Sequence, residues 1–174
     1  MAQYPIIGIA GKARSGKDTT ARFIIAERGG YQYAFADPIR QMARIVGVDM
    51  REQYWQDRKE EVIPALGVSP RCIMQTLGSW GRDTNPQFWI NLAVQRLWAM
   101  GPGMVISDVR YENEADWIRR QGGRIIHLYR DEAPEVEAHH SENGIAVQEG
   151  DGIIYNNGSL EDLQLAVKDI LHEA

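Results

Sequence analysis

Short apolar runs alternate with longer amphipathic segments along this chain. Runs at residues 4–10, 103–107 and 124–129 have the length and β-branched character of buried strands, and residues 31–36 and 153–155 add two shorter extended segments. Helical patterns occupy 19–28, 111–121 and the residues after Ser159. Alternating strands and helices at this spacing predict an α/β fold with right-handed crossovers and a central, mostly parallel five-stranded sheet.

The middle of the chain has a different pattern. Residues 48–69 are polar and charged and are interrupted by Pro64 and Gly67, which predicts a mobile, partly helical insertion. Two helices are predicted next, at about 70–77 and 86–100, with a glycine-containing turn between them. Asp37 is predicted to cap a helix that begins at Pro38, and Ser159 to Asp162 has the form of a capping box.

Length and charge limit the classes of function. A chain of 174 residues fits one compact domain, and a net charge of −5 argues against a nucleic-acid polymer as partner. Neither a membrane-spanning apolar stretch nor an export signal is present in the pattern, so we expect a cytoplasmic protein. Most of the 19 basic residues are arginines, which suit small anionic ligands. Cys72 lies in an apolar context and is given no chemical role.

The strongest motif is the glycine-rich stretch from Gly11 to Thr19, between a predicted strand and a predicted helix. It matches G-x-x-x-x-G-K, in which backbone N–H groups surround the β-phosphate and Lys17 reaches the β- and γ-phosphate oxygens. Arg14, inside the loop, is expected near the phosphates or the base. The predicted ATP-binding residues of the loop are Gly11, Lys12, Arg14, Ser15, Gly16, Lys17, Asp18 and Thr19.

One position departs from the usual loop. Asp18 stands where a serine or threonine normally ligates Mg²⁺, and the hydroxyl comes one residue later, at Thr19. Either side chain can serve as the ligand, because a carboxylate can also hold the ion directly or through water. Asp108, which ends a buried strand, is a third candidate for holding Mg²⁺ or orienting the acceptor, with an ion pair to Arg110 as the alternative.

Several blocks, in order, resemble the bacteriophage deoxynucleoside monophosphate kinases. They comprise residues 11–20 with the Lys-Asp-Thr-Thr ending, 35–40, 74–78 followed by Arg82 and Trp89, 108–110, 139–142 and 150–161. The resemblance implies a three-layer P-loop kinase fold spanning residues 1–174, with a helical acceptor-binding insertion at about 48–85 and a short lid at about 130–150. It also implies ATP and a deoxynucleoside monophosphate as substrates, Mg²⁺ as cofactor, and a homodimer. The chain looks shorter than well-known members.

The remaining roles combine the residues with this resemblance. Planar guanidinium groups match phosphate oxygens, so arginines are candidates for clamping the acceptor phosphate, and a lid arginine, Arg130, is expected at the transferring phosphoryl group. With Lys17 and Asp108, Arg130 completes the predicted catalytic set. Asn157 and Gly158 resemble the segment that borders adenine, although a turn explains them almost as well. The predicted acceptor-binding residues are Asp37, Arg40, Arg82, Trp89, Arg110, Ser141 and Glu142.

Two alternative functions stay open from the sequence. The strand-end Asp-x-Arg and the later Ser-Glu are also similar to animal-type phosphomevalonate kinases, which makes a kinase of another phosphorylated metabolite the second hypothesis. A nucleotide-dependent switch is the third, and the lack of an Asn-Lys-x-Asp guanine-reading motif argues against it. Among the tryptophans, Trp55 and Trp80 lie in polar surroundings and are the two candidates for stacking on a base.

Overall fold

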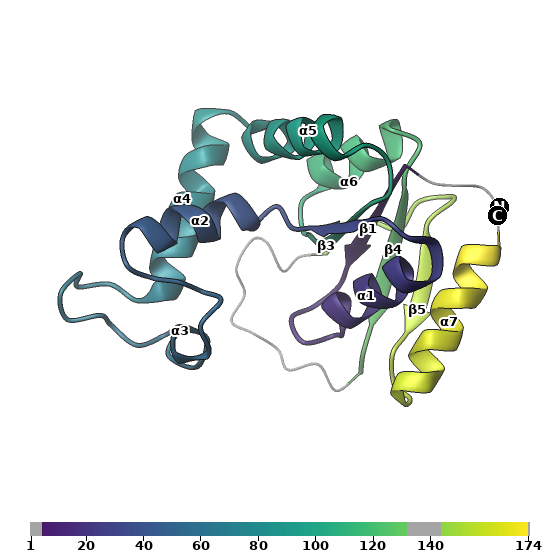
Figure 1. Ribbon diagram of the computed structural model, residues 1–174, viewed down its shortest axis with the longest axis horizontal. Coiled ribbons are helices and arrows are strands. Elements are labelled where there is room, and N and C mark those ends of the chain that lie inside the picture. Colours follow the sequence, from purple (N-terminus) through teal and green to yellow (C-terminus); the bar gives the residue numbers. More distant parts are fainter. Residues whose placement is uncertain (1–4, 132–143, 174) are drawn as a thin grey trace. The chain divides into compact units, whose positions relative to one another are not determined.

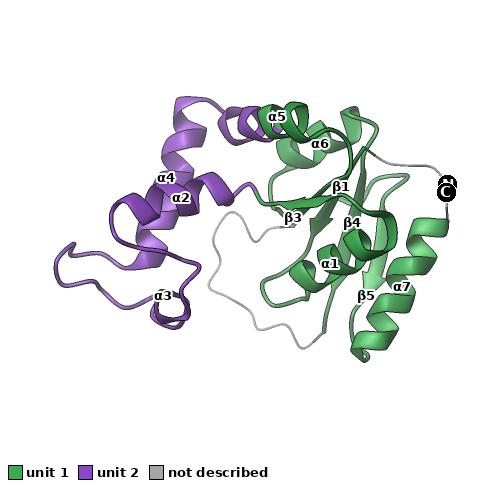
Figure 2. Ribbon diagram, viewed as in Figure 1, with its two compact units in different colours: residues 1–34, 94–174 green, residues 35–93 purple. Residues whose placement is uncertain are grey.

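The computed structural model describes residues 5–131 and 144–173, and the chain divides into two compact units (Figure 2). Unit 1 comprises residues 1–34 and 94–174 and contains the sheet. Unit 2 comprises residues 35–93, a wider range than the insertion predicted at 48–85. In the described residues, no helix combines the length and apolar character needed to cross a membrane.

The sheet of unit 1 confirms the predicted parallel architecture. Its order is β2-β3-β1-β4-β5, and every neighbouring pair is parallel. The strands are β1 (Ile6–Ala10), β2 (Tyr31–Tyr33), β3 (Met104–Val109), β4 (Arg124–Tyr129) and β5 (Gly152–Tyr155). Because all five run in one direction, their carboxyl ends meet at one edge of the sheet, where the loops that follow β1, β3 and β4 come together.

Helices cover both faces of this sheet and make it the middle of three layers (Figure 1). On one face, α1 (Lys17–Arg28) and α7 (Leu160–His172) pack over a core that includes Ile7, Ile9 and Leu128. On the other face, α6 (Glu112–Arg120) lies so close to β1 that a Cβ on Gly8 would be 2.7 Å from the Cδ1 atom of Ile118. All five residues of β1 are buried, as its unbroken apolar run predicts.

Unit 2 is helical. It contains α2 (Asp37–Ile45), α3 (Gln53–Asp57), α4 (Pro70–Thr84) and the first part of α5 (Phe88–Met100). The buried residues of this unit include Ile39, Ala43 and Val48, with Trp89 and Ile90 from α5. The predicted charged insertion holds only the short α3 and one isolated bridge between Ile63 and Val68.

The turn predicted between residues 77 and 86 is wrong for most of its length, because α4 continues to Thr84. Gly78 and Gly81 lie inside the helix, where they allow close packing. A Cβ on Gly81 would be 2.4 Å from a ring carbon of Trp89, and the Trp89 indole N–H donates to the Gly78 carbonyl at 3.0 Å. Gly81 is therefore needed for the tryptophan to pack on the helix, and neither glycine ends the helix.

The two predicted helix starts have different outcomes. Ser159 caps α7 as predicted: its Oγ accepts from the Asp162 N–H at 3.2 Å, and the Asp162 carboxylate accepts from the Ser159 N–H at 2.8 Å. Asp37 does not cap α2, because the cap residue is Ala36 and Asp37 is already helical. The Asp37 carboxylate instead accepts a hydrogen bond from Arg40.

Candidate active site

The loop between β1 and α1 has the close backbone packing expected of a phosphate-binding loop. A Cβ on Gly11 would lie 2.4 Å from the Leu128 carbonyl oxygen, so only glycine fits against β4 at this point. Gly16 has a φ of 104°, and a Cβ there would lie 2.6 Å from the Asn156 amide nitrogen. Arg14 adopts a left-handed φ of 62°. The loop thus curls tightly into the amino terminus of α1, where backbone N–H groups attract anions.

Lys17 closes this loop from the inside. Its Nζ atom donates to the carbonyl oxygens of Gly11, at 2.7 Å, and Lys12, at 2.6 Å, so the ammonium group is held across the mouth of the loop. Ser15 is fully buried, and its hydroxyl has no hydrogen-bond partner within the described residues. A buried hydroxyl without a partner is costly, and a polar ligand in the loop would satisfy it.

The two candidate magnesium ligands at the start of α1 have different surroundings. Asp18 is exposed, and its carboxylate accepts at 3.0 Å from the Gln32 amide, which also lies 3.0 Å from the Ser107 hydroxyl. These bonds link Asp18 to the carboxyl end of β3, next to Asp108. The hydroxyl of Thr19 instead accepts from Arg22, one turn later on the same helix, at 3.2 Å. Asp18 is therefore the candidate that is tied to the strand edge.

The carboxyl end of β3 brings Arg110 to the phosphate loop. A small cavity of about 30 Å³ is lined by Gly11 and Lys12 on one side and by Arg110 and Ile145 on the other. The backbone N–H of Arg110 donates at 2.9 Å to the buried carboxylate of Glu114, which fixes this turn. Asp108, two residues before Arg110, is half-buried. Arg110 thus shares a small cavity with Gly11 and Lys12, and its role in acceptor binding stays a prediction.

Arg130 and Asn157 follow neighbouring strands, β4 and β5. Arg130 is exposed at the end of β4. The Asn157 side chain binds Asp131 at two points, since its oxygen accepts from the Asp131 N–H at 3.0 Å and its nitrogen donates to the Asp131 carboxylate at 2.8 Å. A Cβ on Gly158 would lie 2.5 Å from the Asp162 carboxylate, so this glycine serves the start of α7.

Asn156 contacts the phosphate loop, which the sequence interpretation did not predict. It is buried, and its side-chain amide donates to the Ser15 carbonyl oxygen in the phosphate loop at 2.8 Å. Its backbone N–H donates to the Tyr129 carbonyl at 2.7 Å, which continues the pairing of β4 and β5. The sequence interpretation placed the Asn-Asn-Gly segment beside the adenine or in a turn, and in the structure its first asparagine contacts the loop.

Unit 2 carries the other predicted acceptor residues. Arg40 pairs with Asp37 on α2 at 2.8 Å, and both side chains are partly exposed. Arg82 lies in the last turn of α4. Trp89 is 3% exposed and its indole N–H is satisfied by α4, which favours a packing role over contact with a ligand. Its role in acceptor binding stays a prediction, as do those of Asp37, Arg40 and Arg82.

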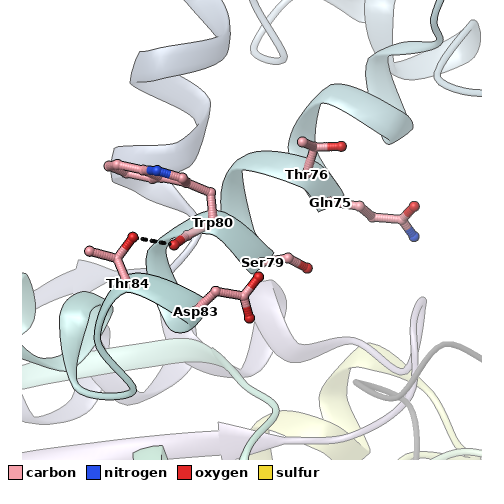
Figure 3. A pocket seen from close by; sticks show the side chains of 6 residues that line it. All are labelled: Gln75, Thr76, Ser79, Trp80, Asp83 and Thr84. Carbon is pink, nitrogen blue, oxygen red and sulfur yellow. Dashed lines mark hydrogen bonds between the residues drawn. The ribbon is translucent and has the colours of Figure 1, made fainter.

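A hollow of about 560 Å³ lies along one side of α4 (Figure 3). Trp80 is 48% exposed there, and its ring meets the Phe88 ring edge-on with the centroids 5.4 Å apart. Within the described residues, the structure gives the side chains of Gln75 and Asp83 no hydrogen bond or ion pair. The residues that line the hollow are Gln75, Thr76, Ser79, Trp80, Asp83 and Thr84.

The predictions for Ser141 and Glu142 and for a metal site remain. Ser141 and Glu142, with His139 and His140, lie outside the described residues. Among the residues that are described, no group of three or more His, Cys, Asp or Glu side chains is placed to hold a metal ion. Mg²⁺ in phosphoryl-transfer sites needs no such group, because it is bound by one or two carboxylates together with substrate phosphates.

Comparison with known proteins decides the family. The family model described as deoxynucleotide monophosphate kinase matches residues 5–61 and 49–167, which together include all five strands, the phosphate loop and unit 2. The chain belongs to the deoxynucleotide monophosphate kinase family. Its α/β architecture is that of a P-loop kinase, as the sequence predicted.

Individual relatives agree with this assignment. A putative deoxynucleotide monophosphate kinase of Acanthamoeba polyphaga mimivirus is 29% identical over 175 residues, covering 90% of this chain and 91% of the relative. The deoxynucleotide monophosphate kinase of Enterobacteria phage T4 is 26% identical, covering 95% of this chain and 98% of that protein. That alignment spans 236 positions, more than the 174 residues here, so the phage T4 protein carries insertions relative to this member of the family.

The fold also matches solved structures. An unliganded sugar kinase from Janibacter sp. HTCC2649 superposes with a TM-score of 0.55 at 16% identity, covering 97% of this chain and 95% of its own. Similarity at this level of identity concerns the fold. It supports the three-layer architecture.

Proposed function

We propose that this kinase transfers the γ-phosphoryl group of ATP to a deoxynucleoside monophosphate and releases ADP and a deoxynucleoside diphosphate. An oxygen of the acceptor phosphate attacks the γ-phosphorus, and the bond from that phosphorus to the β–γ bridging oxygen breaks. The observation that carries the proposal is the loop geometry, in which Lys17 spans the mouth of a tight glycine loop in a chain of this family. The family match favours this acceptor over phosphomevalonate and over a switch function.

On the donor side, the backbone N–H groups of the loop and the Lys17 ammonium would neutralise the β- and γ-phosphates. Lys17 would exchange its hydrogen bonds with the Gly11 and Lys12 carbonyls for bonds to phosphate oxygens. Bound Mg²⁺ supplies further neutralisation of the phosphate charge. The carboxylate of Asp18 fits such an ion, because it is exposed at the amino terminus of α1 and linked through Gln32 to the strand end that carries Asp108.

Arginines from unit 1 would complete the charge balance. Arg110 lines the same small cavity as Gly11 and Lys12, which supports a contact with the acceptor or transferring phosphate. Arg130 leaves the end of β4 as an exposed side chain and is our candidate for stabilising the charge on the transferring group. The roles of Arg110 and Arg130 are proposed from their positions in the fold. The acceptor roles of Arg40 and Arg82 in unit 2 are also proposals.

For the acceptor base we propose the hollow along α4 (Figure 3). The exposed ring of Trp80, held edge-on by Phe88, offers a surface for stacking, and stacking of a base on an aromatic side chain contributes about 1–3 kcal/mol. The carboxylate of Asp83 lies one turn further along the same helix and accepts hydrogen bonds, so it suits the amino group of a base. The volume of the hollow falls within the usual range for ligand sites.

A coupled assay of ADP release tests the proposed function. ATP and Mg²⁺ are supplied with each common ribo- and deoxynucleoside monophosphate in turn, and with phosphomevalonate. We expect ADP release that depends on at least one deoxynucleoside monophosphate. Release without any acceptor, or with phosphomevalonate alone, would contradict the proposal. A Lys17→Ala preparation, purified in parallel, controls for contaminating kinases.

A further inference from the structure

Two consecutive asparagines connect the phosphate loop to the strand end that carries Arg130. Asn156 is bound through its side chain to Ser15 in the loop, and Asn157 is bound through its side chain to Asp131. The contact from Asn156 is buried, whereas Asn157 and Asp131 are exposed. The peptide unit between Asn156 and Asn157 therefore joins the contact with the phosphate loop to the contact with the end of β4.

The contact at the loop end leaves little freedom. The Asn156 amide fills the space over Gly16, where a Cβ would lie 2.6 Å from its nitrogen, and the Asn156 backbone continues the β4–β5 pairing through Tyr129. A shift of Asn156 would move either the strand pairing or the Ser15 carbonyl. The backbone that carries Asn157 is thus held in place by the contacts of Asn156.

The contact at the strand end uses both ends of an amide. The oxygen of Asn157 must face the Asp131 N–H, since only an acceptor fits there, and this leaves its NH₂ group to meet the Asp131 carboxylate. Arg130 immediately precedes the residue held in this way. The Arg130 side chain is exposed, and its backbone continues directly into Asp131.

We propose that Asn157 is a positioning residue, which holds Asp131 and thereby directs Arg130 toward the phosphate loop, and that it does not read the adenine ring. This inference rests on the proposed function for the role of Arg130. Misplacement of a catalytic group by about 1 Å can cost up to roughly a hundredfold in rate, so loss of the contact should affect turnover more than binding of ATP.

An exchange of the two side chains gives a sharp test. Asn157→Asp places a carboxylate against the Asp131 carboxylate and should lower kcat about tenfold or more, with the KM for ATP changed less than about twofold. Asp131→Asn alone keeps a partner for the Asn157 amide and should have a small effect. The double variant restores a carboxylate–amide pair in the reverse order, because the carboxylate at position 157 accepts from both the backbone N–H and the side-chain amide at position 131. The kcat of the double variant should be within about threefold of the wild-type kcat.

Other outcomes distinguish the alternatives. If Asn157 reads adenine, Asn157→Asp will raise the KM for ATP, and the added Asp131→Asn change will not rescue it; that result would overturn the proposal. Asn91→Asp, at an exposed asparagine on α5, is the matched control and should leave kcat unchanged.

A second measurement separates this inference from the proposed function. Amide hydrogen exchange at position 131 should be faster in Asn157→Asp than in the wild type and should slow again in the double variant. Equal exchange rates at position 131 in the wild type, Asn157→Asp and the double variant would show that Asn157 does not hold Asp131, whatever the measured activity. Absence of any acceptor-dependent turnover by the wild type would count against the proposed function, and hydrogen exchange would still decide whether Asn157 holds Asp131.

Discussion

The guanidinium of Arg119, on α6, meets the carboxylate of Asp151, just before β5, at two points: Nη2 lies 2.7 Å from Oδ2 and Nε lies 3.2 Å from Oδ1. His127 Nε2, on β4, lies 2.9 Å from the same Oδ2 atom, and the Gln148 N–H donates to it at 2.9 Å. The Asp151 side chain is only 2% exposed. This cluster joins helix α6, strand β4 and the chain segment that precedes β5.

Removing the guanidinium should be severely destabilising. Arg119→Ala leaves the buried Asp151 carboxylate with much weaker compensation, and breaking a buried pair from one side typically costs about 3–5 kcal/mol. Because Arg119 is partly exposed, we expect the lower end of that range in the free energy of unfolding, measured by urea titration. Arg120→Ala, at the exposed neighbouring position, is the control and should change it by less than about 0.5 kcal/mol. Equal effects of the two variants would contradict a buried pair.

The same carboxylate predicts how stability depends on pH. Burial raises the pKa of Asp151, but hydrogen bonds from Arg119, the Gln148 N–H and His127 outweigh it and leave the pKa below its ordinary value of 3.8. A lowered pKa in the folded state means that the ionised carboxylate stabilises the fold fully above the unfolded value and loses this effect as the pH falls through the folded value. We therefore expect the wild type to lose stability below about pH 4 more steeply than Asp151→Asn does.

Urea titrations from pH 7 to pH 3 measure this difference. Asp169→Asn, at an exposed position on α7, serves as the control and should follow the wild-type curve. Parallel curves for the wild type and Asp151→Asn would show that Asp151 does not contribute to the acid loss.

Lys17→Ala should remove phosphoryl transfer. The Lys17 ammonium group spans the loop and, by the loop motif, reaches both the β- and γ-phosphates, and loss of such a contact typically lowers kcat by roughly 10² to 10³ or more. Folding should be little affected, because Lys17 is partly exposed and its hydrogen bonds to the Gly11 and Lys12 carbonyls lie at the surface. The ADP-release assay measures turnover, and Lys168→Ala on α7 is the matched control. Near-normal turnover of Lys17→Ala would remove the catalytic assignment.

The parts of the fold that the sequence predicted well are those with local causes. Ile6 to Ala10 is an unbroken apolar run and became a fully buried strand, and the glycine spacing of the phosphate loop is a property of a few adjacent residues. Ser159 and Asp162 are also neighbours on the chain, so their capping box could be recognised from spacing alone.

The parts that could not be predicted depend on distant contacts. Gly78 and Gly81 look like a turn in isolation, yet the helix continues through both, and the packing of Trp89 explains the glycine at position 81. Asn156 looks like part of a turn until its contact with Ser15, 141 residues earlier, is known. Asp18 and Thr19 could not be separated from sequence, because the Gln32 amide that donates to Asp18, and also to Ser107, comes from a neighbouring strand of the sheet.

The choice between Asp18 and Thr19 can be tested by Mg²⁺ dependence. Asp18→Asn removes the carboxylate that is linked to the strand edge, and we expect it to raise the Mg²⁺ concentration for half-maximal ADP release by about tenfold or more. Thr19→Ala should raise it less, because the Thr19 hydroxyl is bonded to Arg22 along the helix. The reverse order, with the larger shift in Thr19→Ala, would assign the ion to the hydroxyl.

Trp80→Ala tests the hollow on α4 as the site of the acceptor base. The loss of one stacking surface, at about 1–3 kcal/mol, corresponds to roughly a five- to hundredfold rise in the KM for the deoxynucleoside monophosphate, with the KM for ATP unchanged. Trp98→Ala, at an 80% exposed tryptophan on α5, is the matched control. Asp83→Asn adds a second readout, because replacing an acceptor-only carboxylate by an amide should change the order of preference among the four bases. If both variants keep the wild-type KM and the wild-type preference, the base must be bound elsewhere.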